Sequence, residues 1–406
     1  MNAVAPGLMH WVSLTGPAGV ELHFAEFVRA ARERHPQWSQ AWLSPGQSMH
    51  PELQANLGQS LNRTVMAKRW HGIKLPSKPE WIRCHHLRRE FKRANAKLAI
   101  VWNRTARTKF VVDAIGAENC IHWEHGSAWH PGRERERRDY LHRVPVAITN
   151  SHASARVLQL LWQYPGAVRV CLNALRPSLV PSVTQAKIFP SSRPIRLGIA
   201  ARLLPVKGIA VALNAMKNLI EQSFDAQLHI AGVGAEREQL ESLAQNLGVG
   251  SSTCFHGAVD DMPAFYRGID CLIHPALTEA FGLVAIEAAA HGCPVIAAAV
   301  DGLPEAVAHG VSGYCLRPTL SMTDYAHMGG GPSGVPEFVY DPEKDEMCPP
   351  RIIDPAELAA AVLRLFDQRE SYESLSGAAS SHVLHKFEFA THVDEVMAVV
   401  DGQASR

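Results

Sequence analysis

Residues 269–292, IDCLIHPALTEAFGLVAIEAAAHG, contain the clearest structural pattern of the chain. The run IDCLIHP is typical of a buried strand, and LVAIEAAAHG is typical of a helix that ends at glycine. Between them lies the turn TEAFG, which follows the carboxyl end of the strand. Strand, turn and helix in this order predict one unit of a parallel α/β sheet.

The same alternation of strand and helix recurs in both halves of the chain. Strand-like runs in the first half include LMHWVSL, LAIVW, CIHWEH, VAITN and VRVCLN, and those in the second include RLGIAAR, AQLHIAG, STCFHG and CPVIAAA. A chain of 406 residues is also too long for one ordinary core. We therefore predict two Rossmann-like, doubly wound domains with a cleft between them.

A segment without periodicity, RPSLVPSVTQAKIFPSSRP, is rich in Pro and Ser and is typical of a linker. We place the first domain at residues 1–187 and the second at residues 188–387, and we expect the last helix, residues 388–406, to pack back on the first domain. Residues 318–355 are dense in Gly, Pro and acids and have no helix-length period. We interpret them as a structureless insertion on the second domain.

The composition is that of an ordinary soluble protein, with 47% hydrophobic and 19% charged residues. No apolar run is long enough to span a membrane, and the first residues do not resemble an export signal. The eight cysteines are scattered without a CxxC pair or any clustering with histidine, so we expect reduced thiols and no zinc site. These features predict a cytoplasmic protein.

The near-zero net charge hides an opposition between the two halves. Residues 1–190 contain 26 Lys/Arg against 12 Asp/Glu, a charge of +14, and the remainder has a charge of −13. The densest basic stretch, residues 63–97, is interleaved with Trp70, Trp81 and Phe91. Cations among aromatic rings suit an anionic membrane surface, although a merely solvated charged face has the same composition. No nucleic-acid module accompanies the patch, so no nucleic-acid partner is expected.

The turn and helix of the opening motif predict an anion site. Phe281, Gly282 and Leu283 supply amides at the helix N-terminus, and glycine allows a ligand to approach the backbone. Glu279 lies outside this positive end, where it can accept hydrogen bonds from sugar hydroxyls, and Glu287 lies inside the helix, where its oxygens suit a ribose. The alternative is that Glu279 is a helix cap and Glu287 a solvated surface residue.

Two cations follow the first strand of the same domain, in IRLGIAARLLPVKG. Arg202 and Lys207 are placed to hold a diphosphate beside the helix N-terminus, unless both are ordinary surface charges. The chain contains no Asp-x-Asp triplet, so no metal is expected to accompany the diphosphate.

In the first domain, the turn TGPAGVE places Gly19 between strand and helix, and CIHWEHG places His125 at a strand end. A strand-end histidine can reach a substrate hydroxyl, or it can be a packed structural residue. A metal site made by His122, Glu124, His125 and His130 is disfavoured, because we expect alternation along the strand to separate the first three side chains. No GxGxxG fingerprint is present, which argues against a dehydrogenase.

The second half resembles the retaining glycosyltransferases of family 4, which have the GT-B fold of two facing Rossmann-like domains. The motifs AAR, PVKG, HIAGVGAE, CFHGAV, DCLIHPALTEAFGLVAIEAAAHGCPVIAAAVDGLPEAV and GVSGYCLRP occur in the family's order over residues 195–318. The first half resembles the family more loosely, through TGPAGVELHFAEFVRA, WEHG, ITNSHASARVL and VCLNAL. Ala201 and Asp301 replace usual glycines, and the insertion is not general to the family.

The resemblance implies roles for individual residues. Arg202 and Lys207 correspond to cations on the donor diphosphate, with Gly19 beneath it, and the backbone of residues 281–283 cradles phosphate and sugar. Glu279 corresponds to a contact to the donor sugar. Glu287 corresponds to a ribose ligand. His125 corresponds to a histidine near the transferred sugar.

The resemblance implies a metal-independent hexosyltransferase without a cofactor, whose donor is a UDP or GDP sugar. The acceptor expected is an anionic glycan or glycolipid of lipopolysaccharide or polysaccharide biosynthesis, at the inner face of the plasma membrane. A nucleotide-sugar epimerase of the same architecture and a non-catalytic nucleotide- or carbohydrate-binding protein remain as alternatives.

Overall fold

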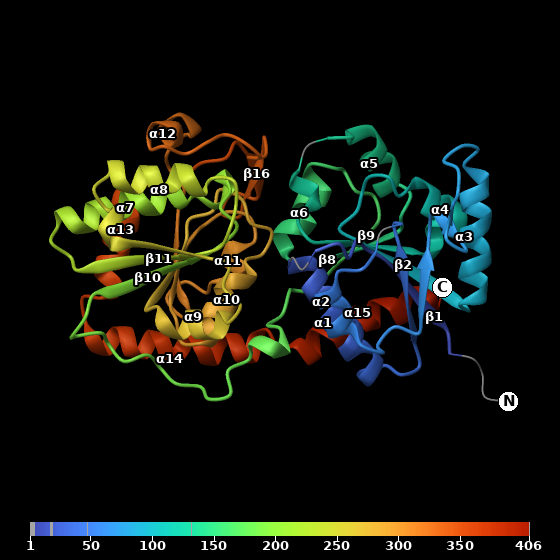
Figure 1. The fold of residues 1–406 in the computed structure, drawn as a ribbon, viewed down its shortest axis with the longest axis horizontal. Helices are drawn as coiled ribbons and strands as arrows, with labels where there is room; N and C mark the ends of the chain where they lie inside the picture. The colour runs from blue at the N-terminus through green and yellow to red at the C-terminus, as the bar shows by residue number, and fades with distance from the viewer. Residues whose placement is uncertain (1–4, 17–18, 47, 131, 406) are drawn as a thin grey trace. The chain divides into compact units, whose positions relative to one another are not determined.

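The structure, a computed structural model, describes residues 5–16, 19–46, 48–130 and 132–405. The chain divides into two compact units (Figure 1). The first comprises Met1–Leu172 and Phe389–Arg406, and the second comprises Asn173–Glu388.

The first unit is built on a parallel sheet whose strand order, within the described residues, is β3-β2-β1-β6-β7-β8-β9. Strands β1 and β7 are buried along their whole length, including the polar side chains of His10, His122 and Glu124. The strands are β1 (Gly7–Trp11), β2 (Ser39–Ser44), β3 (Arg63–Met66), β6 (Ala96–Trp102), β7 (Cys120–Glu124), β8 (Val146–Thr149) and β9 (Ala167–Val170), with a small hairpin of β4 (Arg69–Trp70) and β5 (Ile73–Lys74). The helices are α1 (Gly19–Arg34), α2 (Pro51–Leu57), α3 (Trp81–Arg93), α4 (Lys109–Ile115), α5 (Glu134–Leu141), α6 (His152–Leu160) and α15 (Phe389–Ala404).

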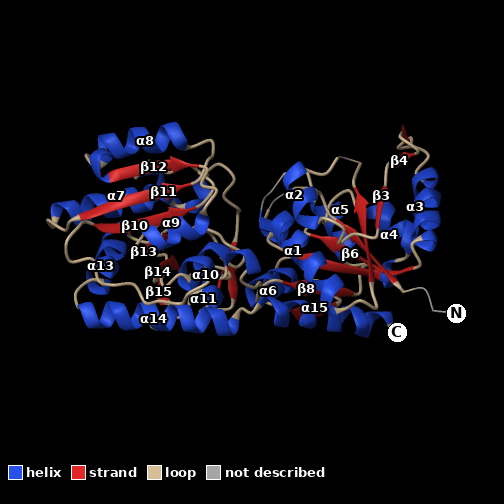
Figure 2. Cartoon of the chain, turned by 60° about the horizontal axis from the view of Figure 1, so that its bottom comes forward, coloured by secondary structure: helices blue, strands red, loops and turns tan. Residues whose placement is uncertain are grey.

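The second unit has a parallel sheet in the order β12-β11-β10-β13-β14-β15. Figure 1 shows its helices on both faces of the sheet, and Figure 2 shows the strands of each unit between helices. The strands are β10 (Ile195–Ala200), β11 (Ala226–Ala231), β12 (Thr253–Gly257), β13 (Cys271–His274), β14 (Val295–Ala298) and β15 (Gly313–Leu316). The helices are α7 (Ile209–Glu221), α8 (Arg237–Asn246), α9 (Met262–Gly268), α10 (Leu283–Ala290), α11 (Leu303–Ala306), α13 (Pro355–Leu365) and α14 (Arg369–Lys386).

The order of strands reverses between β10 and β13 in this sheet. From β10 the chain moves outward through β11 to β12, and it then returns to place β13 on the other side of β10. Ligands of open α/β sheets bind beyond the carboxyl ends of the strands at such a reversal. The prediction of Rossmann-like parallel sheets is confirmed, and the reversal indicates where a ligand site belongs.

The predicted domain boundary at residue 187 is wrong, because residues 173–187 pack with the second unit. The backbone N–H of Lys187 donates to Ser376 Oγ at 2.7 Å, and its Nζ donates to the carbonyls of Tyr266 and Arg267, each at 3.0 Å. The final helix α15 belongs to the first unit, where Asp401 accepts a 2.7 Å hydrogen bond from the Trp38 indole.

The segment 318–355 is not structureless, as the sequence suggested. It contains α12 (Met322–His327), which begins with a capping box formed by Ser321 and Asp324, and an antiparallel hairpin of β16 (Val339–Asp341) and β17 (Glu346–Cys348). Backbone hydrogen bonds between Leu320 and Ile352, at 3.0 and 3.1 Å, close its base. Elements this short carry too few turns to produce a periodic sequence signal.

In the part of the chain that the structure describes, no helix has both the length and the apolar character needed to cross a membrane.

Candidate active site

Residues 269–292 form the strand, turn and helix that their sequence predicts. Gly282 precedes α10 with φ +102°, in the left-handed region, and a Cβ atom at this position would lie 2.6 Å from Leu303 Cδ2. No side chain caps the helix, so its first amides are not satisfied from that source. Phe281 is buried against Phe387, and its side chain therefore anchors the turn while its backbone stays at the helix end.

The turn after β10 and the turn after β13 meet backbone to backbone. Leu277 N–H donates to the Val206 carbonyl at 2.8 Å, and a Cβ atom at Gly208 would come within 2.0 Å of the Pro275 carbonyl oxygen. Because these two strands are neighbours at the reversal of the sheet, the fold brings together two motifs that lie about 70 residues apart in sequence.

Lys207 and Glu279 form an ion pair at this junction. Lys207 Nζ lies 2.6 Å from Glu279 Oε2, with side-chain exposures of 16% and 22%, and His274 Nε2 lies 3.5 Å from the same oxygen. Burial by itself would raise the pKa of Glu279, but the Lys207 ammonium and the His274 ring outweigh it and hold the pKa well below its ordinary value. Glu279 is therefore a carboxylate in an electropositive pocket and not a helix cap.

Arg202 is exposed, and its guanidinium makes no hydrogen bond or ion pair with any residue that the structure describes. It follows β10, as predicted, and it leaves its charge available at the same end of the sheet. The structure thus gives the two predicted cations different states, since Lys207 is paired and Arg202 is not.

Glu287 lies on α10 with both carboxylate oxygens held by the protein. Arg176 Nη2 donates to Oε1 at 3.2 Å, and Tyr266 Oη donates to Oε2 at 2.8 Å. Glu287 is 5% exposed, so the alternative of a solvated surface residue is wrong. Burial and the adjacent carboxylate raise the pKa of Tyr266 well above its ordinary value, which keeps the phenol a hydrogen-bond donor.

A third carboxylate, Asp301, organises the turn from below. Its Oδ2 accepts from Thr278 Oγ1 at 2.6 Å and from Glu279 N–H at 3.0 Å, while its Oδ1 accepts from Tyr340 N–H at 2.7 Å. Asp301 is 1% exposed and has φ +48°. One buried side chain therefore connects the Glu279 turn with strand β16 of the 318–355 segment.

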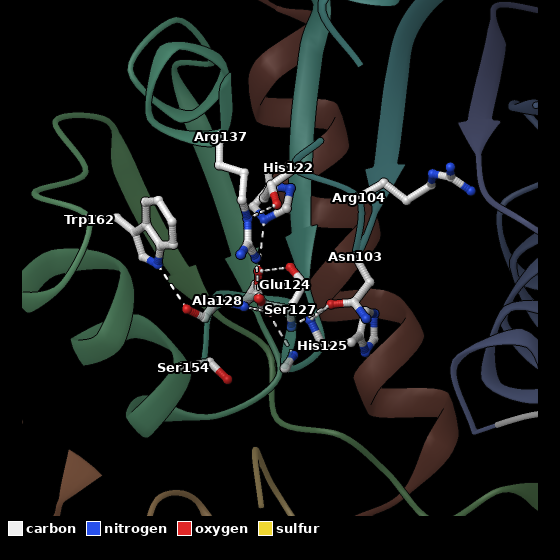
Figure 3. Close-up of polar contacts among 12 residues, drawn as sticks. Asn103, Arg104, His122, Glu124, His125, Ser127, Ala128, Arg137, Ser154 and Trp162 are labelled. Atoms are coloured by element: carbon white, nitrogen blue, oxygen red, sulfur yellow. Dashed lines mark hydrogen bonds and ion pairs between the residues drawn. The ribbon is translucent and has the colours of Figure 1, made fainter. Parts of the chain in front are cut away.

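In the first unit, the turn after β7 is held by buried polar side chains (Figure 3). Glu124 Oε1 accepts from the N–H groups of Gly126 and Ala128 at 2.7 and 3.0 Å, and Oε2 accepts from Ser127 Oγ at 2.8 Å and His122 Nε2 at 3.0 Å. Burial alone would raise the pKa of Glu124, but these hydrogen bonds and His122 lower it to about 2. His122 and Glu124 lie on one face of the strand and contact each other, so the expectation that alternation separates them is wrong.

His125 lies beside this turn on aromatic side chains. Its ring stacks on Trp102 with centroids 5.4 Å apart and 3° between the planes, and its backbone N–H donates to Asn103 Oδ1 at 3.0 Å. Burial lowers the pKa of His125 to about 3, so the ring is neutral. Its Nε2 is buried without a hydrogen-bond partner among the described residues, which leaves one polar atom for a ligand.

Gly19 is the first residue of α1, but Pro17 and Ala18 lie outside the described residues, so the predicted turn is seen only in part.

Four residues that position the predicted glutamates were not predicted from the sequence. Arg176, Tyr266, His274 and Asp301 each hold one of the two predicted glutamates, directly or through its backbone. Only Asp301 left a signal in the sequence, as a departure from a usual glycine.

The chain is similar in sequence and in fold to known glycosyltransferases. Residues 184–328 match the family model described as Glycosyl transferases group 1. The D-inositol 3-phosphate glycosyltransferase of Streptomyces griseus is 36% identical over 160 residues, which cover 36% of this chain and 34% of the relative. The chain spans about a third of the length of the curated relatives that it matches first, at 30%, 34% and 35%.

Two solved structures resemble the whole chain. A glycosyltransferase from Rickettsia africae has a TM-score of 0.74 at 16% identity and covers 98% of each chain. Anabaena HepE in complex with UDP has a TM-score of 0.71 at 18% identity, and covers 98% of this chain and 100% of that one. The fold is that of the GT-B glycosyltransferases, with two Rossmann-like α/β domains.

Proposed function

We propose that this chain is a retaining glycosyltransferase of family 4 that moves a hexose from a nucleoside-diphosphate sugar to a hydroxyl of an anionic glycan or glycolipid. The observation that carries the proposal is the part-buried pair of Lys207 and Glu279 beside the uncapped end of α10. Cation, carboxylate and helix amides at a sheet reversal offer partners for a diphosphate and for the sugar attached to it.

The donor is held in two parts. Lys207, Arg202 and the amides of residues 281–283 bind the diphosphate, and Glu279 accepts hydrogen bonds from the sugar hydroxyls. Glu287, fixed by Tyr266 and Arg176, uses its remaining lone pairs for the ribose. The UDP complex of the structurally similar HepE supports a UDP-type donor, and the same contacts accommodate GDP.

Catalysis rests on stabilising the leaving group. The bond from the anomeric carbon to the diphosphate oxygen breaks, and a bond to the acceptor oxygen forms on the same face. The acceptor's proton passes to the departing diphosphate oxygen, so no protein nucleophile is needed. Cations and amides placed where this charge develops contribute several kcal/mol. The proposal includes no metal and no cofactor, and it places His125 and its unpartnered Nε2 near the transferred sugar.

The donor is testable without knowledge of the acceptor. We expect UDP or GDP sugars to raise the melting temperature of the protein. The Glu287→Gln variant should need at least about tenfold more ligand for the same rise. Glu221→Gln is the matched control, because Glu221 is an exposed glutamate of the same unit. The absence of a shift with UDP, GDP and ADP sugars would contradict the proposal.

Turnover separates the proposed function from its alternatives. With donor alone, we expect slow hydrolysis, which Lys207→Ala lowers about tenfold or more while the exposed Lys217→Ala leaves it unchanged. Release of an epimerised nucleotide sugar would instead identify an epimerase. Donor binding without turnover, even with glycolipid extracts, would identify a binding protein.

The acceptor side of the proposal rests on the basic first unit. Trp70, Ile73 and Trp81 are 48%, 71% and 67% exposed on the β4–β5 hairpin and at the start of α3, among the cations of residues 63–97. Exposed aromatic and apolar side chains among cations suit an anionic bilayer surface. We propose a cytoplasmic protein that binds the inner face of the plasma membrane at this surface.

Flotation with anionic liposomes at two ionic strengths tests the membrane proposal. We expect binding that weakens with salt and that falls at least about threefold in Trp81→Ala and in Lys74→Ala. Arg88 is unsuitable for this test, because its guanidinium donates to the carbonyls of Asp113 and Ala114 at 2.8 and 3.0 Å. Binding that is indifferent to salt and to both substitutions would rule out the proposed surface.

A further inference from the structure

Three side chains able to bind a metal ion lie together in the second unit, outside the proposed donor site, so the expectation that no cysteine clusters with histidine is wrong. They are His229 on β11, and Cys254 and His256 on β12. One potential ligand atom of each lies within 4.8 Å of the others. Within the described residues, no other group of three or more such side chains has this spacing.

The pairing of two strands creates this cluster. His229 lies directly opposite Cys254 in the parallel register, and Cys254 and His256, two residues apart, point to the same face. The register shifts between Ile230 and Ala231, so that Ala231 pairs with Gly257 and His256 has no residue opposite it. An irregularity of this kind re-aims a side chain, and here it turns the second imidazole toward the first.

Two short contacts connect the three side chains, through different nitrogens of His256. His229 Nδ1 and His256 Nε2 are 3.0 Å apart, the two rings stack with 16° between their planes, and Cys254 Sγ lies 4.0 Å from His256 Nδ1. Phe265 of α9 packs its edge against the His256 ring.

We propose that His229, Cys254 and His256 bind a zinc-class divalent metal ion through two imidazole nitrogens and one thiolate, with a fourth position open to water. Mixed nitrogen and sulfur ligands favour zinc over magnesium or calcium, which prefer oxygen. The cysteine thiol loses its proton to solvent when the metal binds.

A metal ion bound at this site would stabilise the β12 edge of the second unit's sheet. β12 is the outermost strand next to β11, and no strand among the described residues pairs with its other edge. A metal bridging β11 and β12 binds the paired strands and not the separated ones, so it stabilises the edge of the sheet by mass action. This role is independent of the proposed transfer reaction.

Zinc and cobalt titrations of the reduced, chelator-treated protein test the site. We expect one equivalent of zinc to be bound in competition with a chromophoric chelator, and the melting temperature to rise with zinc. Cobalt should produce thiolate charge-transfer absorption, which reports directly on Cys254. Cys254→Ser and His256→Ala should each weaken zinc binding at least about tenfold and remove the zinc-dependent rise in melting temperature.

The matched control is Cys348→Ser, which replaces a part-exposed cysteine of the same unit. The side chains of His229, Cys254, His256 and Cys348 all lie outside the core. The melting temperature without metal shows whether each variant is folded. Zinc binding of equal strength in wild type, Cys254→Ser and Cys348→Ser would overturn the proposal. So would binding without thiolate absorption in the cobalt form, or an absence of stoichiometric binding by the wild type.

Discussion

Asp301 shows what a single residue can connect. A left-handed backbone, at φ +48°, is costly for most side chains and easiest for glycine, Asn and Asp. Here an aspartate occupies it, and its buried carboxylate holds Thr278, the backbone of Glu279 and the backbone of Tyr340. The short segment 318–355 thereby contacts the turn that carries the proposed sugar contact.

We expect Asp301→Asn to lower kcat of the proposed reaction about tenfold and to change donor affinity less than about threefold. All three groups around the carboxylate are donors, and an amide can accept on one side only, so one bond to the Glu279 turn or to Tyr340 is lost. Steady-state kinetics and nucleotide titrations measure the two effects separately.

The control for Asp301→Asn is Asp341→Asn at the end of β16, where, among the described residues, the carboxylate accepts from the local N–H groups of Glu343 and Lys344. A lowered melting temperature in Asp301→Asn with unchanged kcat would show that Asp301 only stabilises the fold.

At the scale of elements, the beginning of α10 depends on Gly282. We expect Gly282→Ala to destabilise the second unit by about 2 kcal/mol, because alanine is strained at φ +102° and its Cβ would lie 2.6 Å from Leu303 Cδ2. The helix end must shift to relieve this contact, so nucleotide affinity should fall as well.

Urea unfolding and nucleotide titration measure both changes. Gly310→Ala is a matched control, since Gly310 also has a positive φ, +77°, but a Cβ there would have nothing within 4 Å. If Gly282→Ala and Gly310→Ala lower the free energy of unfolding equally, the close contact with Leu303 at the start of α10 does not destabilise the unit. Adding Leu303→Ala to Gly282→Ala removes the contact and leaves the strain of the backbone.

For the whole molecule, the buried histidines of the first unit predict how that unit responds to acid. All nine tryptophans lie between residues 11 and 162, in the first unit, so tryptophan fluorescence reports on this unit alone. The same unit contains His10, His125 and His392, and burial lowers their pKa values to about 4, about 3 and about 4. Burial and the Trp102 indole, whose Nε1 donates to His10 Nδ1 at 3.1 Å, keep His10 neutral, and they outweigh Gln40 Oε1, which lies 2.7 Å from Nε2 and acts to raise the pKa.

We expect the first unit to lose stability as the pH falls from about 6.5 toward 4. The unfolded histidines bind protons near pH 6.5 while the folded ones remain neutral, so each ring lowers the unfolding free energy by about 1.4 kcal/mol per pH unit in this range. Denaturant unfolding at pH 7.5, 6 and 5, followed by tryptophan fluorescence, should show this slope.

His392→Gln should reduce the dependence on pH, whereas the substitution of the exposed His85 by Gln should not. A fluorescence midpoint that stays constant from pH 7.5 to 5 would contradict the assignment of neutral buried rings.

The amino-acid sequence was sufficient to predict the strand, turn and helix units, the two Rossmann-like sheets and the positions of Glu279, Lys207 and Gly282 after strands. These features depend on local periodicity and on glycine at chain turns, which neighbouring residues specify. Only the tertiary structure decided that Lys207 pairs with Glu279, that Arg176 and Tyr266 hold Glu287, and that His229 meets Cys254 and His256. These contacts join residues from different strands and helices, and they depend on strand order and register, which no local pattern encodes.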